Sequence, residues 1–336
     1  RGPTADALVA ALGPDALLSQ ADLQQYRARV REPLRFSYRG FTVETMPPPS
    51  AGGVVVTLLL RGLERLAAHE LPAGSAAEAH LFLELARRAQ AERRFGVVDP
   101  DTLSASERRA RRARWLDGAR WVDRVPIDPN RATPSERVHP LFGMAMKELE
   151  HTTHFSVVDA DGAVVSCTTT LSAGFGARLV AEGVVLNNSV ASFGTAGDNQ
   201  PAGGKRTISS MAPTLLLRGD EPFLVLGTPG GDSIPSTIVQ VLRHVVDHEM
   251  DLADAVNAPR LHHGFVPDEA RYERARPPPR QLLTELGKLG HRLAAPRAVM
   301  GDANDILINA GVAHAYADPR EGGLAAAAGP ASTLGD

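Results

Sequence analysis

The stretch HTTHFSVVDADGAVVSCTTTL, residues 151–171, decides the fold. Apolar and polar residues alternate on both sides of Asp159-Ala-Asp-Gly162, which is the pattern of two antiparallel strands joined by a tight turn. Gly162 stands where such a turn needs a positive φ. The sequence therefore predicts a β-hairpin whose first strand opens with two hydroxyl residues, Thr152 and Thr153.

Other stretches predict an antiparallel sheet with helices before and after it. Residues 210–227 and 301–320 predict two further hairpins. Cap candidates Asp232 and Ser233, with Pro235 in the first turn, predict an apolar helix to about His248. Residues 33–46 predict one strand, residues 54–91 a helix-rich stretch, and residues 96–150 loops and short helices. This order fits a layered α+β architecture.

Composition bounds the class of protein. The 336 residues are 43% hydrophobic, enough for one large or two ordinary domains, and the net charge of −3 does not suggest a nucleic-acid partner. The basic run at 107–115 is interpreted as a solvated helix face. The single cysteine, Cys167, excludes an intrachain disulfide framework and is expected to be buried in its strand. No apolar stretch approaches the roughly 20 residues that span a bilayer.

Metal and nucleotide motifs fail on inspection. Residues 248–252 begin like a zincin helix, but Leu252 stands where a second histidine is needed. The GTPGG of residues 227–231 is not a dinucleotide fingerprint, and residues 199–206 lack the pattern of a phosphate loop. We interpret His151, His154, His262 and His263 as structural. No metal or cofactor is predicted.

A hydroxyl at the start of a strand suits one kind of chemistry. If the chain is cut before Thr152, this threonine gains a free α-amine, whose pKa is ordinarily about 7.7 to 8.0. The amine can accept the hydroxyl proton, so that nucleophile and base belong to one residue. The alternative is that Thr152 and Thr153 are ordinary β-branched strand residues.

Six motifs in order decide between these alternatives. Residues 22–53 resemble the end of the large subunit of the γ-glutamyltranspeptidases, and TTHFSVVDADGAVVSCTTTL resembles the start of their small subunit. The motifs SSMAPT (209–214), GTPGG (227–231), NAPRLHH (257–263) and ADPR (317–320) follow in the family's order. The chain is thus similar to this family of N-terminal-nucleophile hydrolases from about residue 15 to 323. The resemblance implies a four-layer αββα sandwich.

The resemblance also implies roles for particular residues. Thr152 would be the nucleophile, cut from His151 by its own attack, and Thr170 would hydrogen-bond and help to activate it. The amides of Gly230 and Gly231 would form the oxyanion hole, which also fits glycines leading into a helix N-terminus. Ser209 and Ser210 would bind the α-carboxylate of the acyl donor. The expected reaction cleaves a γ-glutamyl, glutathione-type amide and passes the acyl group to water or to an acceptor amine.

Some positions depart from the family. Ser172 stands where an asparagine is usual, and residues 187–193 read NNSVASF in place of NNQMDDF or NNEMDDF. Ser189 and Ser192 thereby replace the residues that hold the donor's α-ammonium, which removes a charge-assisted contact of about 1.5 to 3 kcal/mol. A relaxed-specificity acylase of the glutaryl or cephalosporin type is therefore an alternative. The short segment between Phe193 and Ser209 predicts an open pocket.

The family pattern divides the chain into two parts. Residues 1–151 correspond to the C-terminal portion of the large subunit and residues 152–336 to the small subunit, so a heterodimer of one precursor is expected. The family's donor-gripping arginine falls before Arg1, and the chain begins without methionine or signal peptide, as a processed or truncated product would. An inactive homologue or fragment is thus a third alternative. The compartment stays open: periplasmic or extracellular by resemblance, or cytoplasmic.

Overall fold

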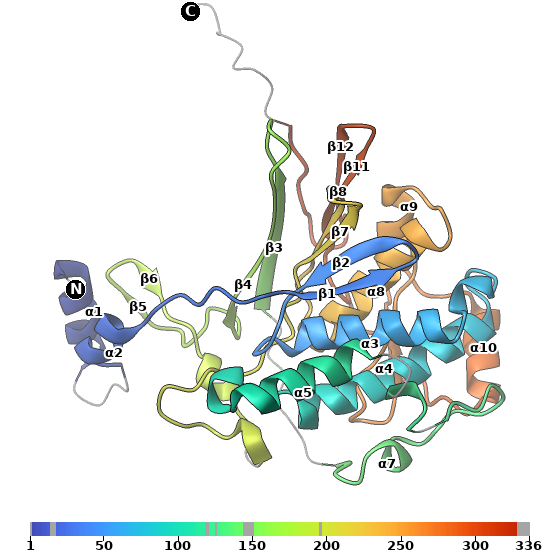
Figure 1. The fold of residues 1–336 in the computed structure, drawn as a ribbon, viewed down its shortest axis with the longest axis horizontal. Coiled ribbons are helices and arrows are strands. Elements are labelled where there is room, and N and C mark those ends of the chain that lie inside the picture. Colours follow the sequence, from blue (N-terminus) through green and yellow to red (C-terminus); the bar gives the residue numbers. More distant parts are fainter. Residues whose placement is uncertain are drawn as a thin grey trace, which may run out of the picture.

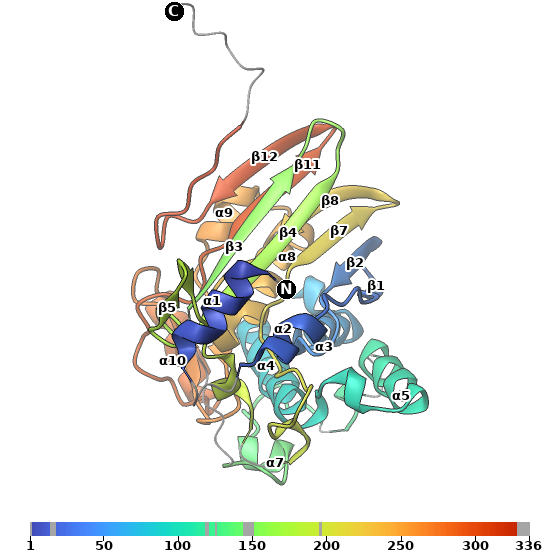
Figure 2. The same cartoon turned by 90° about the vertical axis from the view of Figure 1, so that its left-hand side faces the viewer.

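The helices and strands are arranged in layers around a six-stranded antiparallel sheet. The structure is a computed structural model that describes residues 2–13, 18–117, 121–124, 126–143, 151–194 and 197–327. Helices cover one face of the sheet, as Figure 1 shows. A separate hairpin lies across the other face, which is seen best in Figure 2. This arrangement confirms the predicted class, a mixed α+β fold with antiparallel sheets.

The large sheet joins distant parts of the chain. Its strand order is β1-β2-β7-β8-β11-β12, and each neighbouring pair is antiparallel. The strands are β1 (Leu34–Tyr38), β2 (Phe41–Thr45), β7 (Thr214–Arg218), β8 (Glu221–Leu226), β11 (Asn304–Asn309) and β12 (Val312–Ala317). The hairpins predicted at 210–227 and 301–320 are confirmed as β7–β8 and β11–β12.

The prediction of one strand over residues 33–46 is wrong. The chain turns at Arg39 and Gly40, whose φ angles are 51° and 85°, and returns as β2 beside β1. Two consecutive residues with positive φ are typical of the type I′ turn that closes a tight hairpin. Because apolar residues alternate through both strands, the periodicity alone did not reveal the turn.

The hairpin that opens with Thr152 forms the next layer. It consists of β3 (His151–Val158) and β4 (Val164–Ser172), and Gly162 has the expected positive φ of 85°. Ser166 Oγ donates a 2.7 Å hydrogen bond to the carbonyl of Leu226 in β8, which ties the hairpin to the large sheet. The prediction of this hairpin is confirmed.

The outward face of this hairpin is apolar and open. Phe155, Val157 and Val165 are 49%, 45% and 50% exposed. Cys167, paired with Phe155 across the hairpin, is only partly buried, so the expectation of a buried thiol is wrong. Among the described residues, no helical layer covers this face. The described part of the chain thus forms three of the four layers expected.

Helices form the layer on the other side of the large sheet. The central one is α3 (Ala51–Arg65), which packs against α4 (Ala76–Gly96), α8 (Ile234–Val246) and the first two strands. Its glycines and valines are buried around the whole helix. Among the described residues, α5 (Ala105–Leu116), α7 (Ser135–Val138), α9 (Leu252–Asn257) and α10 (Arg280–Lys288) pack against these three helices. The helices α1 (Pro3–Leu12) and α2 (Gln20–Gln25) lie apart from this layer, and α1 contacts the short strand β5 (Val180–Ala181). The short strand pairs are β5 with β6 (Val184–Val185) and β9 (Leu261–His263) with β10 (Ala270–Tyr272).

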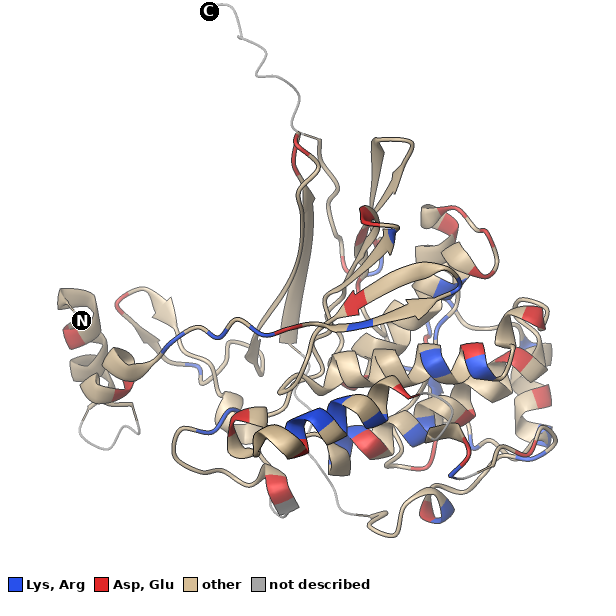
Figure 3. Cartoon of the chain, viewed as in Figure 1, with Lys and Arg blue, Asp and Glu red and all other residues tan. Residues whose placement is uncertain are grey.

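The region from residue 96 to 150 is only partly described. The basic run at 107–115 lies in α5, where Figure 3 shows a concentration of Lys and Arg. Most of its residues are exposed, as predicted for a solvated helix face. Residues 144–150, just before the expected cleavage site, lie outside the described residues. None of the described helices is long and apolar enough to cross a membrane.

Candidate active site

Thr152 and Thr170 face each other across the hairpin. They are paired in the register of β3 and β4, and the Thr152 hydroxyl donates a 3.2 Å hydrogen bond to Thr170 Oγ1. The register shifts between His151 and Thr152, so the strand is irregular at the predicted cleavage site. Both threonines are partly buried, and both line one cavity.

The hydroxyl of Thr170 links three groups. It donates a 2.7 Å hydrogen bond to the carbonyl oxygen of His151 and accepts a 2.9 Å hydrogen bond from the amide of Ser172. It also accepts the hydrogen bond from Thr152. One side chain therefore contacts both the candidate nucleophile and the carbonyl that this nucleophile would attack. Such a hydroxyl can pass a proton from one oxygen to the other and polarise the carbonyl.

The cavity beside Thr152 brings together most of the predicted site residues. It has a volume of about 660 Å³, within the usual range for small-molecule sites. The predicted residues that line it are Thr152, Thr170, Ser172, Ser189, Ser192, Ser209, Ser210 and Gly231. His151 and Gly230 are neighbours of lining residues but do not line it themselves.

The serines reach the cavity from three segments. Ser172, which has a positive φ of 76°, shares a 2.7 Å hydrogen bond with Ser189, so two positions that depart from the family pattern contact each other. Ser209 Oγ accepts a 3.1 Å hydrogen bond from the amide of Met211, while Ser210 is buried. Ser192 ends the short turn of helix that begins at Ser189.

The start of α3 holds the segment that carries Ser209 and Ser210. The carbonyl of Ser209 accepts hydrogen bonds from the amides of Ala51 and Gly52, at 2.7 and 3.1 Å. A Cβ on Gly52 would overlap the carbonyl of Ser210, and one on Gly53 would overlap the carbonyl of Met46. The two glycines thus allow three backbone segments to meet at the cavity wall. The sequence analysis did not foresee this contact.

The GTPGG segment forms a glycine turn before α8. Gly230 and Gly231 have φ angles of 129° and 58°, and Ser233 Oγ donates a 2.7 Å hydrogen bond to the carbonyl of Gly230. Ser233 is therefore the N-cap residue by position, but its side chain bonds backward, into the turn. Backbone conformations of this kind strongly favour glycine.

A buried carboxylate anchors the same turn. Asp232 Oδ2 lies 3.2 Å from Arg271 Nη1 and 3.5 Å from His262 Nε2. Burial alone would raise the pKa of Asp232, but His262 and Arg271 hold it below its ordinary value. The carboxylate is thus charged and fixed by its neighbours. This contact was not foreseen in the sequence, which indicated only that His262 is structural.

The cavity wall carries positive charge that the sequence analysis missed. The cationic lining residues are Arg29, Arg31, Arg93, Lys205 and Arg206, and none of the described lining residues is Asp or Glu. Asp101 lies outside the lining, 2.8 Å from Arg31 and 3.2 Å from Arg206. The wall therefore favours an anionic group on whatever molecule enters.

One buried cluster has side chains of the metal-binding type. His80, Glu84 and His291 bring their donor atoms within 4.8 Å of one another, away from the cavity lining. Glu84 is held by ion pairs from Arg87 and Arg88, and the two imidazoles share a 2.8 Å hydrogen bond. Two guanidinium groups on the carboxylate oppose a bound cation. The cluster fits a structural hydrogen-bond network.

Comparisons with known proteins bear on this site. The sequence model of the family described as Gamma-glutamyltranspeptidase matches residues 1–328. The glutathione hydrolase proenzyme of Escherichia coli (strain K12) is 34% identical over 323 residues, covering 90% of this chain and 54% of that protein. The Acylase ACY 1 proenzyme of Pseudomonas sp. (strain SE83) is 32% identical over 331 residues, covering 90% of this chain and 56% of that protein. The chain thus spans about half the length of these curated relatives.

A solved structure supports the same fold. Cephalosporin acylase from Bacillus halodurans superposes with a TM-score of 0.72 at 22% identity, and the match covers 90% of this chain and 54% of that chain. At this identity the likeness shows the fold alone.

Proposed function

The chain belongs to the gamma-glutamyltranspeptidase family, and on that basis we propose that it is an autoprocessed amidohydrolase or acyltransferase whose nucleophile is Thr152. The observation that carries the proposal is the position of Thr170, whose hydroxyl contacts both Thr152 Oγ1 and the carbonyl oxygen of His151. A threonine that served only as a strand residue would not need this arrangement.

Maturation is the first stage of the proposed mechanism. Thr152 Oγ1 attacks the carbonyl carbon of His151, while Thr170 donates its hydrogen bond to the carbonyl oxygen as negative charge develops there. The C–N bond then breaks as the Thr152 nitrogen takes up the proton lost from the Thr152 hydroxyl, and the acyl group of His151 moves from nitrogen to the Thr152 oxygen as an ester. Water hydrolyses the ester, which frees the Thr152 hydroxyl and leaves a new α-amine on the same residue.

Turnover uses the group that maturation creates. The α-amine accepts the Thr152 proton, and the hydroxyl oxygen attacks the amide carbonyl of a donor. The amides of Gly230 and Gly231 would stabilise the oxyanion, and one such donor is typically worth about 3 to 4 kcal/mol. The leaving amine takes a proton and departs, and water or an acceptor amine then releases the acyl group from Thr152.

The proposal divides the chain into two subunits of one precursor. Residues 1–151 would belong to a large subunit, of which they are the C-terminal portion, and residues 152–336 would form the small subunit. The paired strands β2 and β7 would hold the two together after cleavage. The exposed apolar face of Phe155, Val157 and Val165 supports a fourth, helical layer, which would complete the αββα sandwich.

Two donor classes follow from the cavity. A γ-glutamyl amide would place its α-carboxylate near Ser209 and Ser210, as the family pattern implies. The second candidate is a donor acyl group with a carboxylate but no ammonium, such as glutaryl. The cationic lining favours this donor, because it attracts a carboxylate and repels an ammonium. Ser189, which shares a hydrogen bond with Ser172, also favours it, since the family pattern has an ammonium-binding residue at this position.

Cleavage can be tested by intact mass spectrometry of the full-length protein. The wild-type protein is expected to yield a fragment that begins at Thr152, and Thr152→Ala is expected to stay uncut and inactive. Thr153→Ala is the matched control, because this exposed neighbour should leave cleavage unchanged. An uncut, inactive wild-type protein would favour the third alternative, an inactive homologue; full activity of Thr152→Ala would refute the proposal.

The donor class can be tested separately on the cleaved protein. The ratio of kcat/KM for a glutaryl anilide to that for the γ-glutamyl anilide is measured in the wild type and in Ser189→Glu. If the cavity selects against an ammonium, the wild type prefers glutaryl, and Ser189→Glu shifts the ratio toward γ-glutamyl by about tenfold or more. A strong wild-type preference for γ-glutamyl would remove the second candidate.

A further inference from the structure

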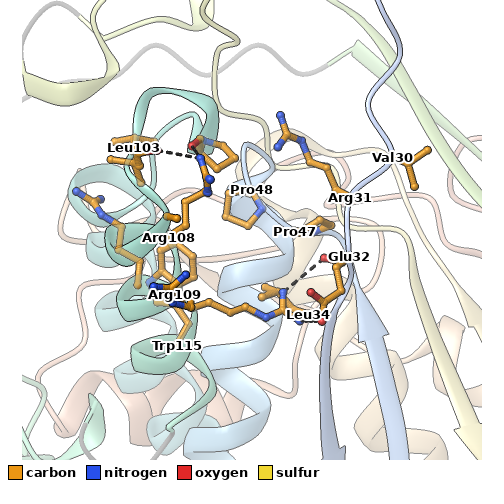
Figure 4. Close-up of a pocket in the computed structure, with 15 residues that line it drawn as sticks. Val30, Arg31, Glu32, Leu34, Pro47, Pro48, Leu103, Arg108, Arg109 and Trp115 are labelled. Atoms are coloured by element: carbon orange, nitrogen blue, oxygen red, sulfur yellow. Dashed lines mark hydrogen bonds and ion pairs between the residues drawn. The ribbon is translucent and has the colours of Figure 1, made fainter.

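A second pocket lies beside the active-site cavity and has a different lining. It has a volume of about 400 Å³ and opens between α5, the segment leading into β1, and the turn at Pro47 and Pro48. Figure 4 shows the side chains that converge on it from these three segments. Arg31 lines both cavities. Pro47 and Pro48 line the second pocket, whereas their neighbours Met46 and Pro49 line the active-site cavity, so this segment separates the two.

The floor of this pocket is apolar. Leu34 and Val98 are fully or almost fully buried, and Trp115 is 4% exposed. The other apolar lining residues are Val30, Pro47, Pro48, Pro100, Leu103 and Ala105. Trp115 is fixed, because its indole N–H donates a 2.8 Å hydrogen bond to Glu92. A rigid aromatic and aliphatic floor of this size suits an aromatic ring or a branched alkyl group.

The rim of the pocket carries a marked excess of positive charge. Five arginines line it, Arg31, Arg108, Arg109, Arg111 and Arg112, against a single carboxylate, Glu32. Glu32 is 3.1 Å from Arg112. Arg31 lies 2.8 Å from Asp101, and Arg111 donates to the carbonyl of Gly96 and lies 3.6 Å from Asp198. Arg108 bonds to the backbone carbonyls of Pro100 and Leu103, so its charge is not compensated by a carboxylate among the described residues.

Arg109 is the rim arginine best placed to receive a ligand. It is exposed and makes no hydrogen bond or ion pair with any other described residue. Its guanidinium can therefore bind an anion without giving up an existing partner. Planar guanidinium groups suit carboxylate and sulfonate geometry, since they can donate two parallel hydrogen bonds.

We infer that this pocket is a binding site for small amphiphilic anions, in which an aromatic or branched apolar body lies on Trp115 and a carboxylate or sulfonate binds Arg109. The site does not depend on Thr152 or on any step of the proposed reaction. Its recognition groups, Trp115 and Arg109, do not line the active-site cavity.

Fluorescence of Trp115 can test this inference. The protein has two tryptophans, so Trp121→Phe in the full-length chain leaves Trp115 as the reporter. Titration with 4-tert-butylbenzoate is expected to give a saturable change in emission. The neutral isostere 4-tert-butylbenzamide is expected to bind about tenfold or more weakly, because it lacks the charge-assisted contact.

Substitutions locate the binding. Arg109→Gln should weaken the benzoate by about tenfold, while Arg137→Gln, an exposed helix arginine outside the pocket, should not change it. If Trp121→Phe does not fold, the difference between wild type and Trp115→Phe reports the same signal. The inference is overturned if no saturable change occurs, if benzoate and benzamide bind equally, or if Arg109→Gln binds as well as the wild type.

Discussion

The imidazole ring of His154 lies directly over the backbone of Gly227, so closely that a Cβ on this glycine would overlap the ring. His154 follows Thr152 by two positions in β3, and Gly227 opens the GTPGG turn. The ring cannot easily yield, because its nitrogens are 2.8 Å from Thr168 Oγ1 and 3.1 Å from Ser156 Oγ. The contact therefore sets how closely the strand of the candidate nucleophile approaches the candidate oxyanion turn.

Gly227→Ala is expected to push these two segments apart. Adding a methyl group to a filled site typically costs about 1 to 3 kcal/mol, and we expect this loss in the free energy of unfolding together with reduced self-cleavage. Urea denaturation and intact mass measure the two effects. Gly287→Ala in α10 is the control, because nothing lies within 4 Å of its Cβ and it should be neutral or slightly stabilising. Equal stability of both variants would contradict the contact.

Thr170→Val should slow self-cleavage while keeping the shape of the side chain. The variant removes the hydrogen bond to the carbonyl of His151, and loss of one such donor typically costs about a hundredfold or more in rate. The time course of fragment appearance by mass spectrometry is the measurement. Thr169→Val, at the adjacent exposed strand position, is expected to cleave at the wild-type rate. Rapid cleavage by Thr170→Val would exclude the proposed role.

The protein is expected to lose stability between about pH 6.5 and pH 4. Burial lowers the pKa of His154, His244 and His263 to about 4, and that of His291 to about 3. The unfolded chain takes up protons near pH 6.5, but the folded chain does not, so stability falls as the pH drops through this window. Each histidine contributes up to about 1.4 kcal/mol per pH unit.

Urea midpoints from pH 7.5 to pH 5 measure this slope. His244→Asn should reduce it by about the share of one histidine, because asparagine can still donate to the carbonyl of Ala255. His314→Gln, on the exposed strand β12, should leave it unchanged. A flat profile in the wild-type protein would contradict the prediction.

Asp305 should act in the opposite direction. Burial raises the pKa of its carboxyl to about 8, although Oδ1 accepts a 2.9 Å hydrogen bond from the amide of Gly227. The folded protein keeps this proton up to about pH 8, whereas the unfolded chain loses it near pH 4. The free energy of unfolding therefore falls as the pH rises from about 4 toward 8. Asp305→Asn should therefore gain stability relative to the wild type between pH 5 and pH 8, measured by urea midpoints. Asp220→Asn, fully exposed, should run parallel to the wild type.

Local patterns in the sequence were enough to predict six of the twelve described strands, those of the hairpins β3–β4, β7–β8 and β11–β12. The hairpin from residue 151 was foreseen because alternation and the turn at Gly162 lie within one short segment. The turn at Arg39 and Gly40 was missed, since its only local sign is one glycine in an otherwise continuous alternation. Periodicity reports which residues face the core, not where a strand reverses.

Most of the site residues taken from the family pattern line one cavity, but the charge of this cavity was not predictable. Arg29, Arg31 and Arg93 reach the wall from segments that are far from Thr152 in the sequence and share no motif with it. The contact of Ser209 with the start of α3 depends on packing between residues about 160 positions apart. Such relationships arise from tertiary structure, which no short motif encodes.

The pairing of β2 with β7 determines how the two parts of the chain associate before and after cleavage. Thr42 to Thr45 pair with Thr214 to Leu217 in the middle of the large sheet, so a cut before Thr152 would sever the chain without separating its products. Folding of the intact chain brings these strands together as an intramolecular event, whereas two cut chains would have to find each other in dilute solution. Maturation of this kind would be irreversible. The assembly would form as a single chain, and after cleavage its two subunits would have to stay paired, because they would reassociate poorly once separated.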